Sequence, residues 1–120
     1  MKIGLVMDED HNLTPLDQGP ILAIIDEEKK LVETYENPGY GVPHGGKEMA
    51  MEAMLTLDAE AVVVKKGFLC PGSYSMSYGR LKYLPTDHQK LEELLNDLEK
   101  VKKEALEELD PEMYAEMYPE

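Results

Sequence analysis

Three continuous apolar runs stand out along the chain, each bounded by polar or turn-forming residues. They occupy residues 2–7, 21–25 and 61–64. Short runs of this kind, with several β-branched side chains, predict buried strands. Residues 31–35 alternate in character after a compact polar turn, so they are predicted to pair with residues 21–25 as a β-hairpin.

Two other segments have the spacing of amphipathic helices. Residues 47–57 would place the following side chains on one helical face: Met49, Ala50, Ala53, Met54 and Leu57. The second helix is predicted to begin after Thr86, which forms a capping-box pattern with Gln89. It continues to about Leu109, because an apolar stripe extends that far and Pro111 follows. The stripe consists of Leu91, Leu94, Leu95, Leu98, Val101, Ala105, Leu106 and Leu109.

The remaining segments complete the order of elements. Residues 68–79 are rich in Ser, Tyr and Gly, and they are predicted to be irregular with room for one helical turn. Residues 81–84 are predicted to form a last short strand, which Pro85 ends. A helix between two strands predicts a parallel crossover, whereas the hairpin predicts an antiparallel pair. The fold class is therefore α/β, with a mixed sheet of about five strands, helices covering it and a long C-terminal helix.

The length of 120 residues is that of one domain. We expect residues 1–110, including the C-terminal helix, to form a single α/β domain and residues 111–120 to form an acidic tail. The first apolar run meets Asp8 too early for a secretory signal. The one cysteine, Cys70, cannot form an intrachain disulfide. Both observations favour a reducing, cytoplasmic location.

Charge narrows the function classes. The chain has 25 Asp and Glu residues against 12 Lys and Arg residues, for a formal net charge of −13. Such a field repels phosphate backbones and anionic lipid surfaces, so nucleic-acid and membrane partners are not expected. A basic protein partner is compatible with it.

Several short segments, taken together, resemble one known family. They are Met1-Lys2-Ile3-Gly4 with Asp8-Glu9-Asp10, the hairpin of residues 21–35, Glu36-Asn37-Pro38-Gly39, His44-Gly45-Gly46 and the strand at residues 59–64. Over roughly residues 1–84 the chain is similar to the dinitrogenase iron–molybdenum cofactor biosynthesis family. The resemblance implies a three-layer, ribonuclease-H-like α/β domain with one antiparallel strand in its mixed sheet. It also implies a nitrogenase accessory factor-like role, in which a small protein binds or carries an iron–sulfur or iron–molybdenum cluster precursor.

The segment His44-Gly45-Gly46 precedes the first predicted helix. A helix N-terminus presents free N–H groups, and glycines let the backbone approach a ligand closely, so the segment suits an anion. The neutral imidazole of His44 is a candidate ligand for iron. The resemblance also places this segment beside the proposed cluster site. The alternative is a turn in which glycine provides a positive φ and His44 is solvated.

Cys70 follows the apolar run at residues 61–64, and ligands of α/β sheets collect just beyond the carboxyl ends of strands. A thiolate there is a candidate ligand for an iron cluster, in a site shared with His44, or a nucleophile. A cluster normally has several thiolate ligands, and a dimer would supply a second one. The alternative is a small, inert, partly buried cysteine.

No constellation in the sequence supports an enzyme. The acids at residues 8–10 are bunched in a loop and have no acidic partner in the run at residues 61–64, unlike the two-metal site of a nuclease. Residues 73–80 contain serine and tyrosine but no nucleophile elbow. The segment Gly45-Gly46-Lys47 lacks the spacing of a phosphate loop. We therefore predict a protein that is not an enzyme.

Two functional hypotheses follow. In the first, an accessory protein binds a metal cluster or another small anionic ligand, with His44 and Cys70 as the metal ligands. The candidate ligand-binding residues are His44, Gly45, Gly46 and Cys70. In the second hypothesis, the acidic C-terminal helix recruits a basic protein or a second copy of the chain, with no ligand. The far end of that helix is expected to reach beyond the domain, which would let two copies form a homodimer.

Overall fold

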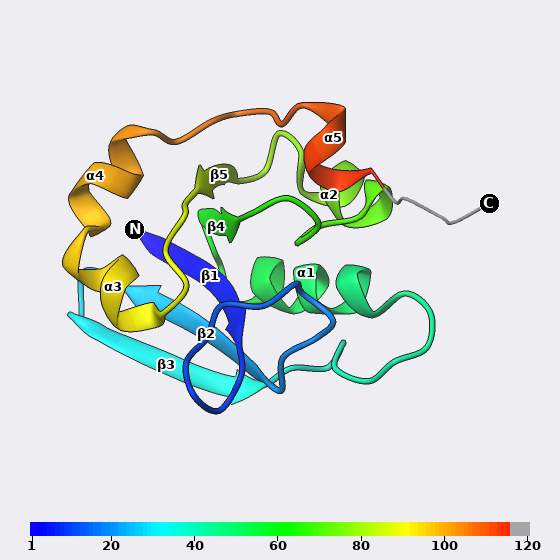
Figure 1. The fold of residues 1–120 in the computed structure, drawn as a ribbon, viewed down its shortest axis with the longest axis horizontal. Coiled ribbons are helices and arrows are strands. Elements are labelled where there is room, and N and C mark those ends of the chain that lie inside the picture. The colour runs from blue at the N-terminus through cyan, green and yellow to red at the C-terminus, as the bar shows by residue number, and fades with distance from the viewer. Residues whose placement is uncertain (116–120) are drawn as a thin grey trace.

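Five strands and five helices succeed one another in the computed structural model, which describes residues 1–115 (Figure 1). The strands are β1 (Lys2–Met7), β2 (Ile21–Asp26), β3 (Leu31–Glu36), β4 (Ala61–Val64) and β5 (Lys82–Pro85). The helices are α1 (Gly46–Thr56), α2 (Pro71–Ser77), α3 (Leu91–Asn96), α4 (Leu98–Lys103) and α5 (Pro111–Tyr114). No helix in this part of the chain has the length and apolar character to cross a membrane.

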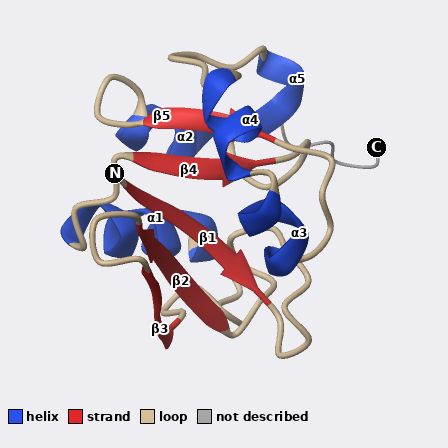
Figure 2. Cartoon of the chain, turned by 90° about the vertical axis from the view of Figure 1, so that its left-hand side faces the viewer, coloured by secondary structure: helices blue, strands red, loops and turns tan. Residues whose placement is uncertain are grey.

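The strands form one mixed sheet in the order β3-β2-β1-β4-β5. Strand β2 is antiparallel to both of its neighbours, whereas β4 is parallel to β1 and to β5. The predicted hairpin, the parallel crossover through α1 and the mixed sheet with one antiparallel strand are therefore confirmed. This pairing places the carboxyl ends of β1, β4 and β5 at the same edge of the sheet (Figure 2).

Helices cover both faces of the sheet, with α1 and α2 on one side and α3 and α4 on the other (Figure 2). The cluster on the α1 side includes Val6, Leu22, Met51, Met54 and Val62. The cluster on the α3 side includes Ile3, Ala23, Val63, Leu91 and Val101. Strands that are buried on both faces have apolar residues at consecutive positions, which explains the continuous apolar runs in the sequence.

Helix α1 lies within one residue of its predicted range, but its buried face is shifted. Ala50 and Met54 face the core as expected. Met49, however, is 43% exposed, whereas Met51 is completely buried. The helix therefore presents Met51 to the sheet and leaves Met49 on the surface.

The segment at residues 68–79 is more regular than predicted. It contains the seven-residue helix α2, which begins directly after Cys70. The backbone N–H of Cys70 donates to Ser73 Oγ at 2.9 Å, and the N–H of Ser73 donates to Cys70 Sγ at 3.4 Å. This reciprocal capping arrangement, together with Pro71 at the first helical position, starts the helix. Serine and tyrosine are only moderate helix formers, so the composition of this segment did not predict helix α2.

The prediction of one long C-terminal helix is wrong. The segment contains the short helices α3 and α4, followed by an extended stretch that leads to α5 (Figure 1). Thr86 Oγ1 accepts a hydrogen bond from the N–H of His88 at 3.1 Å, and no helix begins there. Helix α3 begins at Leu91, where Glu93 Oε1 accepts a hydrogen bond from the N–H of Lys90 at 3.1 Å.

The apolar stripe is divided because this segment passes from one face of the sheet to the other. Leu91 and Val101 are buried on the α3 side, whereas Leu109 is buried in the cluster on the α1 side. Between them, Leu106 exchanges two backbone hydrogen bonds of 2.8 Å with Tyr83 of β5. A straight helix can pack against only one face of a sheet, so these residues do not form one helix. The described C-terminal segment therefore lacks the long helix that was expected to reach a second copy. The homodimer itself stays a prediction.

Helix α5 packs against the rest of the protein. The N–H of Gly67 donates to the carbonyl oxygen of Met113 at 3.0 Å. The ring of Tyr114 stacks on that of Tyr74, with centroids 4.2 Å apart. These contacts fix the first residues of the predicted acidic tail, whereas its Met117-Tyr118 pair lies outside the described residues.

Candidate functional site

A cleft of about 630 Å³ opens at the carboxyl ends of β1 and β4. Its walls come from the loop after β1, the glycine-rich loop before α1, the loop after β4, and α5. The lining residues are Asp17, Val42, Pro43, His44, Gly45, Gly46, Lys47, Glu48, Lys66, Gly67, Cys70, Glu112 and Ala115. The chain leaves β1 toward one side of the sheet, while β4 lies on the other, and α/β sheets commonly bind ligands at such switch points. This carboxyl-end cleft brings together all four residues that the sequence predicted.

The glycine-rich loop packs backbone against backbone beside the cleft. Gly45, the N-cap of α1, has a φ of 78°, which glycine adopts without strain. A Cβ atom on Gly39 would overlap the carbonyl oxygen of Gly46, the first residue of the helix. No side chain caps α1, so its first N–H groups are available to an anion. The positive φ at Gly45 is confirmed, and anion binding there stays a prediction.

Asn37, which the sequence placed only in a turn, holds two walls of the cleft together. Its side-chain amide donates to the carbonyl oxygens of Leu16 and Gly19, each at 2.8 Å. Its Oδ1 accepts a hydrogen bond from the N–H of Gly39 at 3.0 Å. The loop that carries Asp17 is thereby fixed to the glycine-rich loop. Asn37 is a positioning residue, and the sequence indicated it only through the Glu36-Asn37-Pro38-Gly39 segment, which is a turn signature and part of the family resemblance.

Cys70 lines the cleft as the N-cap of α2, and its residue is 3% exposed. Its Sγ lies 3.2 Å from Glu48 Oε1 and 3.4 Å from Ser73 Oγ. The thiol donates to the Glu48 carboxylate in this arrangement. A metal ion that binds a cysteine takes the place of this proton. The alternative of a small, buried cysteine describes its packing correctly, but Glu48 gives the thiol a polar partner inside the cleft.

His44 is exposed and lies at the surface of the same cleft. Within the described residues its imidazole makes no hydrogen bond, as expected for a solvated side chain. An imidazole with both nitrogens free can turn toward a ligand at little cost. The cleft therefore combines a buried thiol with an exposed imidazole.

Charged residues that the sequence did not single out also line the cleft. They are Asp17, Lys47, Glu48, Lys66 and Glu112. The Nζ of Lys47 donates to the carbonyl oxygen of Gly67 at 3.0 Å. The Oδ1 of Asp17 is buried and has no hydrogen-bond partner among the described residues. A buried oxygen without a partner is costly, so a donor or a cation on a ligand would be favoured there.

Within residues 1–115, no group of three His, Cys, Asp or Glu side chains is arranged to hold a bare metal ion. Among the acids of the first loop, Asp8 shapes its own turn. Asp8 accepts hydrogen bonds from the backbone and side-chain amides of Asn12, and these bonds hold the pKa of Asp8 below its usual value. The nearby His11 imidazole bonds to Glu92 and lowers the pKa of that carboxyl. The carboxyl-end cleft therefore has one thiol and one imidazole, a set that suits a preassembled charged ligand better than a bare metal ion.

A neighbouring cleft of about 580 Å³ lies at the carboxyl ends of β4 and β5 and shares Lys66 with the first. Its histidine, His88, has Nε2 2.8 Å from Asp97 Oδ2. Because this imidazole already has a carboxylate partner, it is less available to a ligand than that of His44. His88 therefore serves as a natural control for the histidine in the carboxyl-end cleft.

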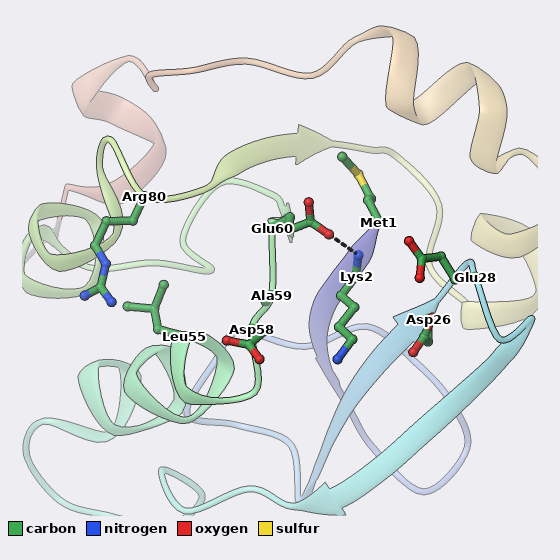
Figure 3. Close-up of a pocket in the computed structure, with 9 residues that line it drawn as sticks. All are labelled: Met1, Lys2, Asp26, Glu28, Leu55, Asp58, Ala59, Glu60 and Arg80. Carbon is green, nitrogen blue, oxygen red and sulfur yellow. Dashed lines mark hydrogen bonds between the residues drawn. The ribbon is translucent and has the colours of Figure 1, made fainter.

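A hollow of about 470 Å³ lies at the opposite, amino end of the sheet (Figure 3). Its acidic lining residues are Asp26, Glu28, Asp58 and Glu60. Glu60 Oε1 accepts a hydrogen bond from the N–H of Lys2 at 3.1 Å, drawn as a dashed line in Figure 3. Asp26 Oδ1 accepts a similar bond from the N–H of Lys29 at 3.1 Å. No histidine or cysteine of the described chain lines this amino-end hollow, so the carboxyl-end cleft is the candidate site.

The chain is thus an α/β protein with a mixed sheet and a cleft at the switch point of that sheet, where ligands of such folds commonly bind. No family model and no curated protein matches the chain. Among solved structures, it is similar to the apo form of the orange protein from Desulfovibrio gigas. The TM-score is 0.69 at 11% identity, covering 82% of this chain and 87% of that one.

Two further solved structures share the fold. A NifB-like protein from Thermotoga, of the DUF35 family, gives a TM-score of 0.64 at 12% identity, covering 82% of this chain and 87% of that one. A dinitrogenase-like protein from Methanocaldococcus jannaschii gives 0.58 at 15% identity, covering 88% and 91%. At these identities the likeness concerns the fold, which this chain shares with nitrogenase-related proteins.

Proposed function

We propose that this chain is a non-enzymatic accessory protein that carries a small anionic cargo in the carboxyl-end cleft. The cargo is an iron–sulfur or iron–molybdenum cluster precursor. One observation carries the proposal: the His44-Gly45-Gly46 segment and Cys70 come from different loops and line the same cleft. In the family that the sequence resembles, the segment matching His44-Gly45-Gly46 lies by the proposed cluster site, which supports the proposal.

The solved structures that share the fold support a cofactor-related role. Two of them are a NifB-like protein and a dinitrogenase-like protein. The orange protein was solved in its apo form, a term for a protein without its bound group. The strand order β3-β2-β1-β4-β5, with β2 antiparallel, supports a ribonuclease-H-like classification of this fold.

An anionic cluster needs ligands for its metal ions and groups that stabilise its negative charge, and the cleft contains both. Without its proton, Cys70 is a sulfur ligand for iron or molybdenum, and Glu48 is placed to accept that proton. His44 offers a nitrogen ligand from the exposed side. The free N–H groups at the start of α1 stabilise negative charge, as do the ammonium groups of Lys47 and Lys66.

A small number of protein ligands suits a carrier better than a permanent site. Structural metal sites typically hold their ion with four protein ligands and release it with difficulty. Within the described residues, no three such side chains are arranged around one ion. A cargo held by one thiolate, one imidazole and backbone N–H groups can leave after few bonds break.

The test is anaerobic reconstitution of the purified protein with ferrous iron and sulfide, with and without molybdate, followed by desalting and metal analysis. The wild-type protein is expected to retain metal and to gain visible absorbance. Cys70→Ser is expected to lower uptake about tenfold or more, because a direct ligand is removed. His44→Ala is expected to have a smaller effect, because its imidazole is only one exposed contact. His88→Ala is the matched control and should match the wild type.

Circular dichroism of each variant distinguishes a loss of binding from a loss of fold. If Cys70→Ser takes up metal like the wild type, the carboxyl-end cleft is not the site. If the wild-type protein retains no metal under any of these conditions, the cargo proposal fails. If His88→Ala loses as much metal as His44→Ala, the neighbouring cleft takes over as the candidate.

A further inference from the structure

A groove of about 500 Å³ runs between the edge strand β3 and helix α1. Most of its lining is apolar: Leu22, Tyr35, Pro38, Met49, Ala53 and Leu57. Two of these large side chains are well exposed, Tyr35 at 39% and Met49 at 43%. No residue lines both this groove and the carboxyl-end cleft, so the two surfaces can be tested separately.

The groove lies beside the open edge of the sheet. Strand β3 pairs with β2 on one side and with no other strand of the described chain. An edge strand directs part of its backbone N–H and C=O groups outward, where another strand can add to it. The opposite edge, β5, is partly covered, because Tyr83 exchanges two backbone hydrogen bonds with Leu106. Strand β3 is therefore the edge at which a new strand could pair.

On the α1 side, β3 presents two apolar side chains with one glutamate between them. Leu31, Glu33 and Tyr35 share this face, since alternate residues of a strand point the same way. Leu31 is 44% exposed and lies beyond the lining of the groove. Exposed apolar residues that adjoin an apolar groove mark a site of interaction rather than a random surface.

The charges around the groove select the kind of partner. Both charged residues that line it are glutamates, Glu36 and Glu52, and each is exposed. Within residues 1–115, neither forms an ion pair. A second copy of the chain would bring the same carboxylates against them, and like charges in close contact cost free energy. A segment with lysine or arginine beside its apolar residues would neutralise them.

We propose that this groove binds an extended, basic-apolar segment of a partner protein, which adds to β3 as a sixth strand. Backbone hydrogen bonds to β3 provide the pairing, and the apolar side chains of the segment fill the groove between Tyr35 and Met49. The basic side chains alternate with the apolar ones, so they lie on the opposite face beside Glu36, which is paired with Ile21 in the register of β2 and β3. Glu52 borders the groove from α1. The surface that recruits a partner is then the β3–α1 groove with its two glutamates, rather than the C-terminal helix that the sequence suggested.

The test uses a short synthetic peptide in which lysine and leucine alternate, added to ¹⁵N-labelled protein. Amide shifts are expected in β3 and α1, and a matching peptide with glutamate in place of lysine should cause none. The double variant Glu36→Lys/Glu52→Lys should bind the lysine peptide about tenfold more weakly, because two attractive pairs become repulsive.

The matched control is Glu107→Lys/Glu108→Lys, which changes the net charge equally at two exposed positions outside the groove. It should stay within about twofold of the wild type, since distant exposed charges are screened. Equal weakening of both double variants would show that the peptide reads only the net charge and would overturn the proposal. Shifts in β3 that depend on protein concentration without peptide would instead assign the groove to a second copy. Cys70→Ser should bind the peptide like the wild type.

Discussion

The carboxyl-end cleft and the amino-end hollow lie at opposite edges of one sheet, but their polar groups are in different states. At the amino end, Asp26 and Glu60 already accept hydrogen bonds from backbone N–H groups. At the carboxyl end, His44 has no partner among the described residues, and the Oδ1 of Asp17 is buried without one. Among the described residues, Asp17 Oδ1 is the buried side-chain oxygen without a partner, and Asp17 lines the carboxyl-end cleft, so this atom favours that cleft over the amino-end hollow.

The connections between the elements explain this difference. At the amino end, residues 27–30 and 57–60 form short turns, and their polar atoms are used to shape those turns. At the carboxyl end, residues 8–20 and 37–45 form longer loops that Asn37 ties together. Long loops on a rigid sheet can present side chains to a ligand, and this is where functional residues gather.

The largest expected effect concerns the backbone contact beside the carboxyl-end cleft. Gly39→Ala places a Cβ atom against the carbonyl oxygen of Gly46, where backbone rather than a flexible side chain must move. We expect the free energy of unfolding to fall by about 3 kcal/mol, at the upper end of overpacking effects. Urea denaturation followed by circular dichroism measures it, and metal uptake should fall with the distortion of the cleft.

The control for this change is Gly41→Ala, two positions further along the same loop. Gly41 has a φ of 73°, but a Cβ atom there would meet no other atom within 4 Å. The cost should therefore be about 1 kcal/mol, from backbone strain alone. If both variants lower the free energy of unfolding equally, the backbone beside the cleft can move at little cost. The proposed difference between the two ends of the sheet would then be weaker.

A smaller effect is expected at the end of α2 that lies away from Cys70. Ser77 Oγ and Tyr83 Oη are 2.8 Å apart, and both residues are completely buried. Burial raises the pKa of the Tyr83 hydroxyl, so it stays protonated. Ser77→Ala leaves this hydroxyl without its partner, which should cost about 1–3 kcal/mol in chemical denaturation.

The double variant Ser77→Ala/Tyr83→Phe removes both polar groups and should recover part of that loss. Metal uptake by the folded fraction should stay at the wild-type level, because this pair supports α2 and lies outside the cleft. Loss of uptake in a well-folded double variant would show that α2 itself, rather than its N-cap Cys70, forms the site.

The sheet could be predicted from the sequence because its signals are local. Strands β1, β2 and β4 are buried on both faces, so their apolar residues are consecutive. His44 and Cys70 could be placed together from the sequence. His44 precedes α1 and Cys70 follows β4, and both positions lie at the carboxyl ends of the parallel strands. The positive φ of Gly45 is likewise a property of one residue and its turn.

The failures concern contacts between distant residues. The stripe from Leu91 to Leu109 has helical spacing, yet it is divided between two faces of the sheet, and Leu106 pairs with Tyr83. Asp17 and Asn37 belong to loops that pack together only in the folded chain. The neighbouring residues indicate a turn at Asn37 and a polar loop at Asp17, and neither pattern indicates that the two loops pack together.

The smallest expected effect is a pH dependence beside the amino-end hollow. Glu27 accepts a hydrogen bond from Lys102 Nζ at 2.7 Å, and its other carboxylate oxygen lies 3.3 Å from the N-terminal ammonium group. The bond from Lys102 is the main reason that the pKa of Glu27 lies below its usual value. We expect Glu27→Gln to lower the free energy of unfolding by less than about 1 kcal/mol at pH 7.

The sign of the pH dependence follows from the lowered pKa. The stabilising contribution of Glu27 is complete above the ordinary pKa of 4.5 and is lost as the pH falls through the lower pKa of the folded state. The wild type and Glu27→Gln should therefore differ in urea midpoint at pH 7 and converge in acid. The control Glu28→Gln makes the same charge change at the next position and should show no such convergence. Normal metal uptake by Glu27→Gln would complete the contrast, because charges at the amino end then stabilise the fold and leave ligand binding to the opposite edge.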